Sequence, residues 1–330
     1  MASPLAPFFV LGSTDGSTGA TALSDFVQEF IQHLINGISL GSIYALIALG
    51  YTMVYGILQL INFAHSEVFM VGAFASYYTA KFLPRLTGHE LPPGVMTLVI
   101  LLVAAMVVCS LLGVTIERFA YRPLRRAPKL NILITAIGVS LLLQYSGQII
   151  FGADPKVFPN VINDSSLFSI GSAEIRVTDV TTLAVALFFM AVLTYMINYT
   201  KTGKAMRAVS QNWTVASLMG INVDRIISMT FIIGSSLAGV GAVLVGMKYP
   251  KIEPLMGMLL GLKAFVAAVF GGIGSLAGAV LGGVLIGLCE EMVSAYISST
   301  YKDAFAFGLL ILVLIFRPAG LLGRPSQEKV

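Results

Sequence analysis

The sequence predicts an all-α, polytopic membrane protein, and three observations support that fold class. Hydrophobic residues make up 57% of the 330 residues and charged residues only 11%, whereas a soluble domain carries about 25% charged residues. The mean hydropathy is +0.88. The apolar residues also lie in long runs without Lys, Arg, Asp or Glu, and about 20 such residues cross a bilayer as one helix. Together these properties exclude an ordinary soluble enzyme and a disordered chain.

Residues 1–25 differ from the rest of the chain in composition. They contain no Lys or Arg, are rich in Ser, Thr, Gly, Pro and Ala, and hold one short apolar patch. A secretory signal peptide needs a positive start and a longer apolar core, so we expect a flexible N-terminal extension instead. The transmembrane domain is then expected over residues 26–316, followed by a cytoplasmic tail over residues 317–330.

Runs without charged residues predict eight to nine transmembrane helices. The first run, residues 30–66, is too long for one span and too short for two. We therefore expect one span near residues 34–55, then a break, then the start of a second span. The remaining runs cover residues 68–80, 91–116, 130–153, 180–200, 226–247, 264–289 and 304–316.

Basic residues predict the orientation of these helices. Residues 117–130, residues 200–225 and the tail after residue 316 carry 12 of the 20 Lys and Arg residues. Cytoplasmic loops are enriched in Lys and Arg, so these three segments and the C-terminus are expected in the cytoplasm. They also explain the net charge of +4, and no nucleic-acid partner is expected. The loop at residues 152–178 lies on the opposite side, where its Pro, Asn and Asp residues predict turns and a short hairpin.

Glycines at a spacing of four residues predict close helix–helix packing. Gly274, Gly278 and Gly282 form one such series, and Gly37 and Gly41 form another with Ala45. Small residues on one helical face let a second backbone approach closely. The cluster at residues 271–275 is different, because it holds three glycines in five residues and breaks the helix. Non-helical backbone inside a membrane must be buried in protein or line an aqueous cavity, so a cytoplasmic turn and a broken or re-entrant element of the substrate path both remain open.

Polar side chains inside apolar runs are costly in a bilayer and are functional candidates for that reason. Residues 62–67 hold the densest group. They could cap a helix that begins near Ser66, line a translocation path or relay protons. His65 and Glu67 are two residues apart and face different sides of a helix, so no metal site is expected. The candidate path residues are Asn36, Asn62, His65, Glu67, Lys263, Gly271, Gly272 and Gly274.

Two further acids, Glu290 and Glu291, lie at the end of an apolar run. We expect them near the outer surface beside Lys302, as a solvated pair.

The sequence contains none of the common catalytic motifs. A phosphate-binding G-x-x-x-x-G-K-[ST] loop, H-E-x-x-H, C-x-x-C and G-x-S-x-G are all absent. We therefore expect no catalytic residue and no cofactor in this chain, which is not an enzyme by this criterion. If the chain takes part in uphill transport, the energy must come from an ion gradient or from another subunit.

Residues 200–225, which we call the candidate coupling segment, help to decide between an ion gradient and another subunit as the energy source. Ala208, Asn212 and Ala216 are spaced four apart and are expected on one face of a short helix, which Gly220 ends. Such a helix can dock in a groove of a partner or can lie on the surface. The candidate coupling residues are Arg207, Ala208, Asn212, Ala216, Ser217, Gly220, Ile221 and Asp224.

Several stretches resemble a known family. The candidate coupling segment resembles the coupling loop of ATP-binding-cassette (ABC) importer permeases. Five other stretches resemble the LivH-type family of high-affinity branched-chain amino acid permeases. They are residues 35–56 (INGISLGSIYALIALGYTMVYG), 61–67 (INFAHSE), 117–125 (ERFAYRPLR), 264–275 (AFVAAVFGGIGS) and 317–323 (RPAGLLG).

This resemblance implies a function and a set of partners. The chain would translocate leucine, isoleucine and valine across a bacterial plasma membrane, which is the inner membrane in a Gram-negative cell. It would work with a second, related permease, two ATPase subunits that use ATP, and a periplasmic or lipid-anchored binding protein, all in contact with membrane lipid. Two features depart from the family pattern, namely the N-terminal extension and Asn212, which stands where such loops often carry an acid.

Two alternatives remain at the level of sequence. One is an ABC permease for urea or short amides, whose sequences are similar. The other is an ion-coupled secondary transporter, which predicts paired carboxylates or a broken-helix ion site near the bilayer midplane.

Overall fold

The computed structural model describes residues 16–88, 91–125, 127–170 and 173–323. In chain order its elements are α2 (Gly16–Leu58), α3 (His65–Thr87), α4 (Val95–Ile116), the π-helix η1 (Glu117–Tyr121), α5 (Arg122–Leu124), α6 (Lys129–Phe151), β1 (Lys156–Val157), β2 (Ser166–Ile170), β3 (Ala173–Arg176), α7 (Val177–Tyr199), α8 (Lys201–Gln211), α9 (Trp213–Leu218), α10 (Val223–Lys248), β4 (Lys251–Ile252), α11 (Met256–Gly271), α12 (Leu276–Tyr296) and α13 (Lys302–Phe316).

Six of the described helices are long and apolar enough to cross a membrane. They are Ser24–Leu58, Val95–Leu124, Leu130–Phe151, Val177–Tyr199, Val223–Lys248 and Leu276–Tyr296. The predicted number of eight to nine is not confirmed. α11 and α13 have 16 and 15 residues, so at 1.5 Å per residue they reach about 24 Å or less, short of a hydrocarbon core of about 30 Å.

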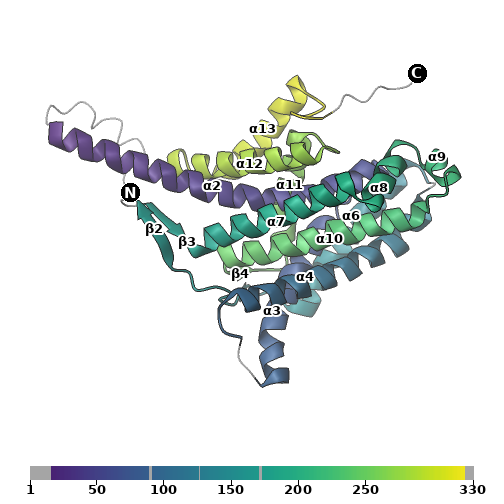
Figure 1. The fold of residues 1–330 in the computed structure, drawn as a ribbon, viewed down its shortest axis with the longest axis horizontal. Helices are drawn as coiled ribbons and strands as arrows, with labels where there is room; N and C mark the ends of the chain where they lie inside the picture. Colours follow the sequence, from purple (N-terminus) through teal and green to yellow (C-terminus); the bar gives the residue numbers. More distant parts are fainter. Residues whose placement is uncertain (1–15, 89–90, 126, 171–172, 324–330) are drawn as a thin grey trace.

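Helix α2 forms the centre of the bundle and packs along α12 (Figure 1). Every residue of α2 from Ser39 to Val54 is buried. The two backbones meet at glycines, as the spacing of four predicts: a Cβ on Gly41 would lie 2.7 Å from the Cα of Val284. On the other helix, Gly283 faces Ala45, and Gly287 faces Gly41. A larger residue at these positions would push the helices apart.

The two ends of the bundle carry different structures (Figure 1). The strands β2 and β3 pair antiparallel and confirm the predicted hairpin, and β1 pairs with β4 beside it. Helices α8 and α9 lie at the opposite end. We refer to these as the hairpin end and the α8–α9 end.

The three basic segments come together at the α8–α9 end. Arg122 and Arg125 form ion pairs with Asp224, which joins the first two segments. The third follows α13 and folds over the α11–α12 turn, where the Leu322 amide donates to the Gly271 carbonyl at 2.8 Å. This arrangement agrees with the predicted placement of all three on one side.

The chain termini differ in part from expectation. Helix α2 begins at Gly16, so residues 16–25 of the expected flexible extension are helical, and residues 1–15 lie outside the described residues. Residues 317–323 of the expected tail pack against the α11–α12 turn, while residues 324–330 also lie outside the described part of the chain.

Substituting Gly41 by Leu is expected to lower the free energy of unfolding by about 1–3 kcal/mol, because overpacking a close contact forces the backbones apart. Gly308→Leu on α13 is the matched control, since a Cβ there meets nothing within 4 Å. Thermal unfolding of the purified full-length variants in detergent measures the difference. Equal melting temperatures would contradict the close α2–α12 contact.

Candidate functional site

The candidate coupling segment forms two helices instead of the single helix expected. Asn212 is extended, with φ −161°, and it separates α8 from α9. Its side-chain oxygen accepts hydrogen bonds from the amides of Thr214 and Val215, at 2.9 and 3.1 Å. Asn is a favoured N-cap residue for this reason. The expectation that Ala208, Asn212 and Ala216 share one helical face is therefore wrong, and Asn212 has a local structural role.

The end of this segment follows the prediction. Gly220 has φ +79°, a left-handed conformation that glycine adopts without steric cost. The Ile221 amide then donates to the Ala216 carbonyl at 3.1 Å, which closes the C-terminal turn of α9. Ser217 on α9 is exposed.

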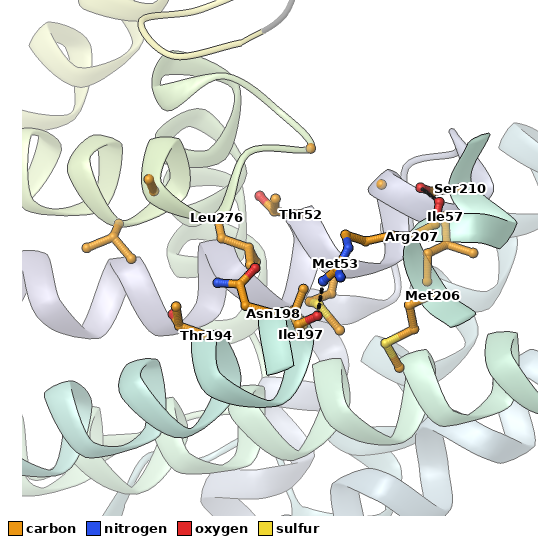
Figure 2. Close-up of a pocket in the computed structure, with 14 residues that line it drawn as sticks. Thr52, Met53, Ile57, Thr194, Ile197, Asn198, Met206, Arg207, Ser210 and Leu276 are labelled. Carbon is orange, nitrogen blue, oxygen red and sulfur yellow. Dashed lines mark hydrogen bonds between the residues drawn. The ribbon is translucent and has the colours of Figure 1, made fainter. Parts of the chain in front are cut away.

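Two side chains tie α8 and α9 to the transmembrane helices. The Trp213 indole N–H donates to the carbonyl of Ile57, at the end of α2, at 3.1 Å. The Arg207 guanidinium donates to the carbonyl of Ile197 on α7, as Figure 2 shows. Both acceptors lie in the last turn of a helix, where carbonyls lack intrahelical partners. The position of α8 and α9 is therefore linked directly to the ends of α2 and α7.

A cavity of about 390 Å³ lies between α2, α7, α8 and α12 at this end (Figure 2). Thr52 and Met53 line it from α2, Thr194 and Asn198 from α7, and Ser210 from α8. Gly274 lies at its edge as part of the α11–α12 turn.

Sequence reasoning missed the outward face of α9. Val215 and Leu218 of α9 are 53% and 81% exposed, and Met219, the residue that caps the helix, is 78% exposed, while Ala216 faces inward and is 3% exposed. Exposed apolar side chains grouped on one short helix are typical of a contact surface for another protein. These three apolar residues lie close to Ala216 in the sequence, so the signal for an apolar surface was present. The expected single helix instead placed the small residues, Ala208 and Ala216, on the outward face.

Asp224 belongs to a network that joins η1, α5 and α10. It pairs with Arg122 and Arg125, and Arg125 also bonds to Glu117, which is 1% exposed. The second oxygen of Glu117 accepts from the Ser228 hydroxyl at 2.8 Å. Glu117 begins the π-helix η1, and π-helical turns are frequent at functional sites.

The segment at residues 62–67 begins α3 as predicted, but without the expected side-chain cap. The Ser66 hydroxyl donates to the Phe63 carbonyl at 2.8 Å. Asn62 accepts from the Tyr121 hydroxyl at 2.9 Å, and the His65 ring lies edge-on to Tyr51 with 4.6 Å between centroids. Glu67 lies on the side facing α11, so the expectation that His65 and Glu67 point apart is confirmed.

Glu290 is buried, which corrects the expected solvated pair. It is 4% exposed, and its oxygens bind the Lys263 ammonium at 2.7 Å and the Tyr44 hydroxyl at 2.8 Å. Lys263 also pairs with Asp303 at 2.5 Å, and Lys302 lies 3.5 Å from Glu290. Opposite charges brought by α11, α12 and α13 make this burial tolerable, because a paired ion costs far less than an isolated one.

Glu291 lies apart from Glu290, at the hairpin end. Its carboxylate accepts from Asn36 Nδ2 at 3.3 Å and lies 3.1 Å from His33 Nδ1. Asn36, Glu291 and Lys302 line a polar cavity of about 660 Å³ together with Lys248 and Asp179, which form an ion pair at 2.7 Å.

The glycine cluster forms a tight turn between α11 and α12. Gly272 and Gly274 have φ +110° and +91°, and Gly272 packs against Gly320 and Gly323. The structure places this turn at the α8–α9 end, and a role of its glycines in a substrate path stays a prediction. The eight candidate path residues are thus distributed over four places. These are the hairpin end, the start of α3, this turn, and the ion cluster formed by Lys263, Glu290, Lys302 and Asp303. Among the described residues, no group of three or more His, Cys, Asp or Glu could hold a metal ion.

Comparison with known proteins assigns the family. Residues 33–314 match the model of the branched-chain amino acid transport system permease component. The chain belongs to this family. The match lies within the predicted transmembrane domain of residues 26–316, and a member of a permease family is a transport subunit and not an enzyme.

Full-length relatives are similar to this permease at substantial identity. The high-affinity branched-chain amino acid transport system permease protein LivH of Escherichia coli K12 is 44% identical over 93% of this chain and 100% of its own length. Its counterpart BraD of Pseudomonas aeruginosa is 43% identical over 92% of this chain and 99% of its own. A solved inward-facing ABC transporter of metal-chelate type aligns with 92% of this chain and 90% of its own, at 15% identity and a TM-score of 0.43, too low to support a conclusion.

Replacing Lys263 by Met is expected to destabilise the permease by up to about 3–5 kcal/mol, because the buried Glu290 carboxylate would lose its closest cation and keep only Lys302, 3.5 Å away, and the Tyr44 hydroxyl. Adding Glu290→Gln to Lys263→Met should recover much of that loss. Lys251→Met is the matched control, since the Lys251 side chain is 65% exposed. Thermal unfolding in detergent measures all three, and a single variant as stable as the control would contradict the buried ion pair.

Proposed function

We propose that this permease translocates branched-chain amino acids, namely leucine, isoleucine and valine, as the membrane subunit of an ABC importer. The observation that carries the proposal is the 44% identity to LivH over the whole length of that relative. The membrane is the bacterial plasma membrane, or the inner membrane of a Gram-negative cell.

Energy comes from separate subunits in this proposal. A second, related permease completes the membrane part, two ATPases bind beneath it and use ATP, and a periplasmic or lipid-anchored binding protein delivers the solute. The positive-inside rule supports a cytoplasmic α8–α9 end, because the three basic segments meet there. The C-terminus is then cytoplasmic as well, and the hairpin end faces the binding protein.

The two alternatives are less well supported. The sequence identity to amino acid permeases argues against a permease for urea or short amides. An ion-coupled transporter needs paired carboxylates or a broken-helix ion site near the midplane. Among the described residues the buried carboxylate of Glu290 is already bound by Lys263 and Tyr44, and Glu67 has no second acid beside it in its cavity.

Reconstitution in liposomes tests the function. The chain alone is expected to give no uptake of labelled leucine with ATP on either side, because it has no phosphate-binding loop. The complete complex with its binding protein and internal ATP should accumulate leucine and should not accumulate urea. Uptake by the lone chain, or uptake of urea by the complex, would contradict the proposal.

Contact with the ATPase is assigned in this proposal to the outward face of α9. Val215, Leu218 and Met219 form an exposed apolar patch. A partner that presses on this patch also moves Trp213, which is bonded to the end of α2, so the geometry supports direct transmission from ATPase to the central helix. Arg207 transmits the same movement to α7.

The double substitution Leu218→Glu and Met219→Glu is expected to abolish co-purification of the ATPase and leucine uptake, because unpaired charges in a buried contact cost several kcal/mol. The chain itself should fold normally, since both side chains are exposed. Gln211→Glu, at an exposed position at the end of α8, adds charge nearby and is the control. Normal co-purification of the double variant would remove the assignment of this surface.

A further inference from the structure

A small cavity lies between α3, α6 and α11, away from the ion cluster and from the candidate coupling segment. Its volume is about 250 Å³. The inner part is polar and is lined by Ser66 and Glu67 of α3 and by Ser140 and Gln144 of α6. The outer part is apolar, and Leu141 and Leu262 at its rim are 46% and 38% exposed. Polar side chains are costly in contact with lipid, so these four polar residues are not expected in a groove that only faces lipid.

Glu67 is the one ionisable carboxylate that lines this cavity, and it is 1% exposed. Its Oε2 atom is buried without a hydrogen-bond partner. Its Oε1 atom lies 3.4 Å from the Ser66 hydroxyl, at the limit of a hydrogen bond. No Lys or Arg is among the residues that line the cavity. The carboxylate therefore differs from Glu290 and Glu117, whose buried oxygens are bound by basic or hydroxyl groups.

The helix packed opposite Glu67 approaches this oxygen closely. A Cβ on Gly257 of α11 would lie 3.1 Å from Glu67 Oε2 and 2.5 Å from the Ser66 carbonyl oxygen, so only glycine lets α11 pack here. The N-terminus of α3 favours a negative charge at Glu67. That dipole stabilises the carboxylate but donates no hydrogen bond to Oε2. Oε2 is closed to solvent and is reached by a ligand when the hydroxyl groups of Ser66 and Ser140, which face the carboxylate, give way.

We propose that this cavity binds the solute during translocation, with Glu67 as the acceptor of its primary ammonium group. A carboxylate–ammonium hydrogen bond is stronger than a neutral one, and a buried acid without a partner gains most from it. The aliphatic side chain of the solute packs against Leu141 and Leu262, and its carboxylate points to the cavity mouth. This inference rests on the proposed function and names the part of the solute that the permease itself recognises.

Protection of an introduced cysteine tests the binding directly. Leu262→Cys is made in a Cys289→Ser background, where the remaining Cys109 is buried, and maleimide labelling of the complex in detergent is timed. Three probes share one carbon skeleton: leucine, isoamylamine, which has only the ammonium, and 4-methylpentanoate, which has only the carboxylate. At concentrations about tenfold or more above their dissociation constants, leucine and isoamylamine are expected to slow labelling by about tenfold or more. At the same concentration 4-methylpentanoate, which lacks the charge-assisted hydrogen bond and so binds at least about tenfold more weakly, is expected to have little effect.

Variants of Glu67 decide whether the carboxylate is responsible. Glu67→Gln should abolish protection by both amines, while Glu67→Asp, which keeps the charge, should retain it and guards against a merely misfolded variant. In liposomes, leucine uptake should fall by about tenfold or more in Glu67→Gln. Glu253→Gln, which makes the same change at an acid whose side chain is 40% exposed, should leave it unchanged.

The outcomes separate this inference from the proposed function. Three results would overturn the ammonium site. The first is protection by 4-methylpentanoate or by sodium chloride that equals protection by isoamylamine. The others are unchanged protection in Glu67→Gln and full leucine uptake by that variant. Absence of leucine uptake by the wild-type complex would instead contradict the proposed function, because the labelling measurement requires no transport.

Discussion

The structure depends on the direct contact between the backbones of α2 and α12. Glycines on both helices remove the side chains that would hold them apart, and within a bilayer this packing contributes more to association than burial of apolar surface. The contact sets the distance at which Glu290 of α12 reaches Tyr44 of α2. It also positions the α11–α12 turn, on which the C-terminal segment rests. A chain with larger residues at Gly41 and Gly287 would have to rearrange all of these contacts.

Buried polar groups in this bundle fall into two kinds. Lys263, Glu290 and Glu117 have partners of opposite charge: Lys263 and Glu290 pair across α11 and α12, and Glu117 pairs with Arg125. Their charges stabilise the packing of those helices once it has formed, and a ligand would have to displace a partner to bind them. Glu67 is of the other kind, since one of its oxygens has no partner. An incomplete set of hydrogen bonds in a low-dielectric interior is costly, and it therefore points to a ligand more strongly than burial alone.

The α8–α9 end illustrates how local and distant contacts combine. Asn212 and Gly220 shape the segment through their own backbone preferences. Trp213 and Arg207 then attach it to α2 and α7, through carbonyls that the ends of helices leave unpaired. The segment thus presents an apolar surface outward while it remains bonded to the two transmembrane helices behind it.

The amino-acid sequence by itself determined the features that depend on neighbouring residues. Charge-free runs identified the membrane class, and the length of the first run identified the break after α2. Turn residues identified the hairpin, clustered glycines identified the interruption of the helix at residues 271–275, and the family motifs identified the permease. Tertiary structure decided the rest. Glu290 was expected in solvent because its partners Lys263 and Tyr44 are 27 and 246 positions away, and no local pattern encodes such a pairing. The outward face of α9 and the unpartnered oxygen of Glu67 were likewise hidden, because exposure and hydrogen bonding are set by the surrounding helices and not by spacing along one of them.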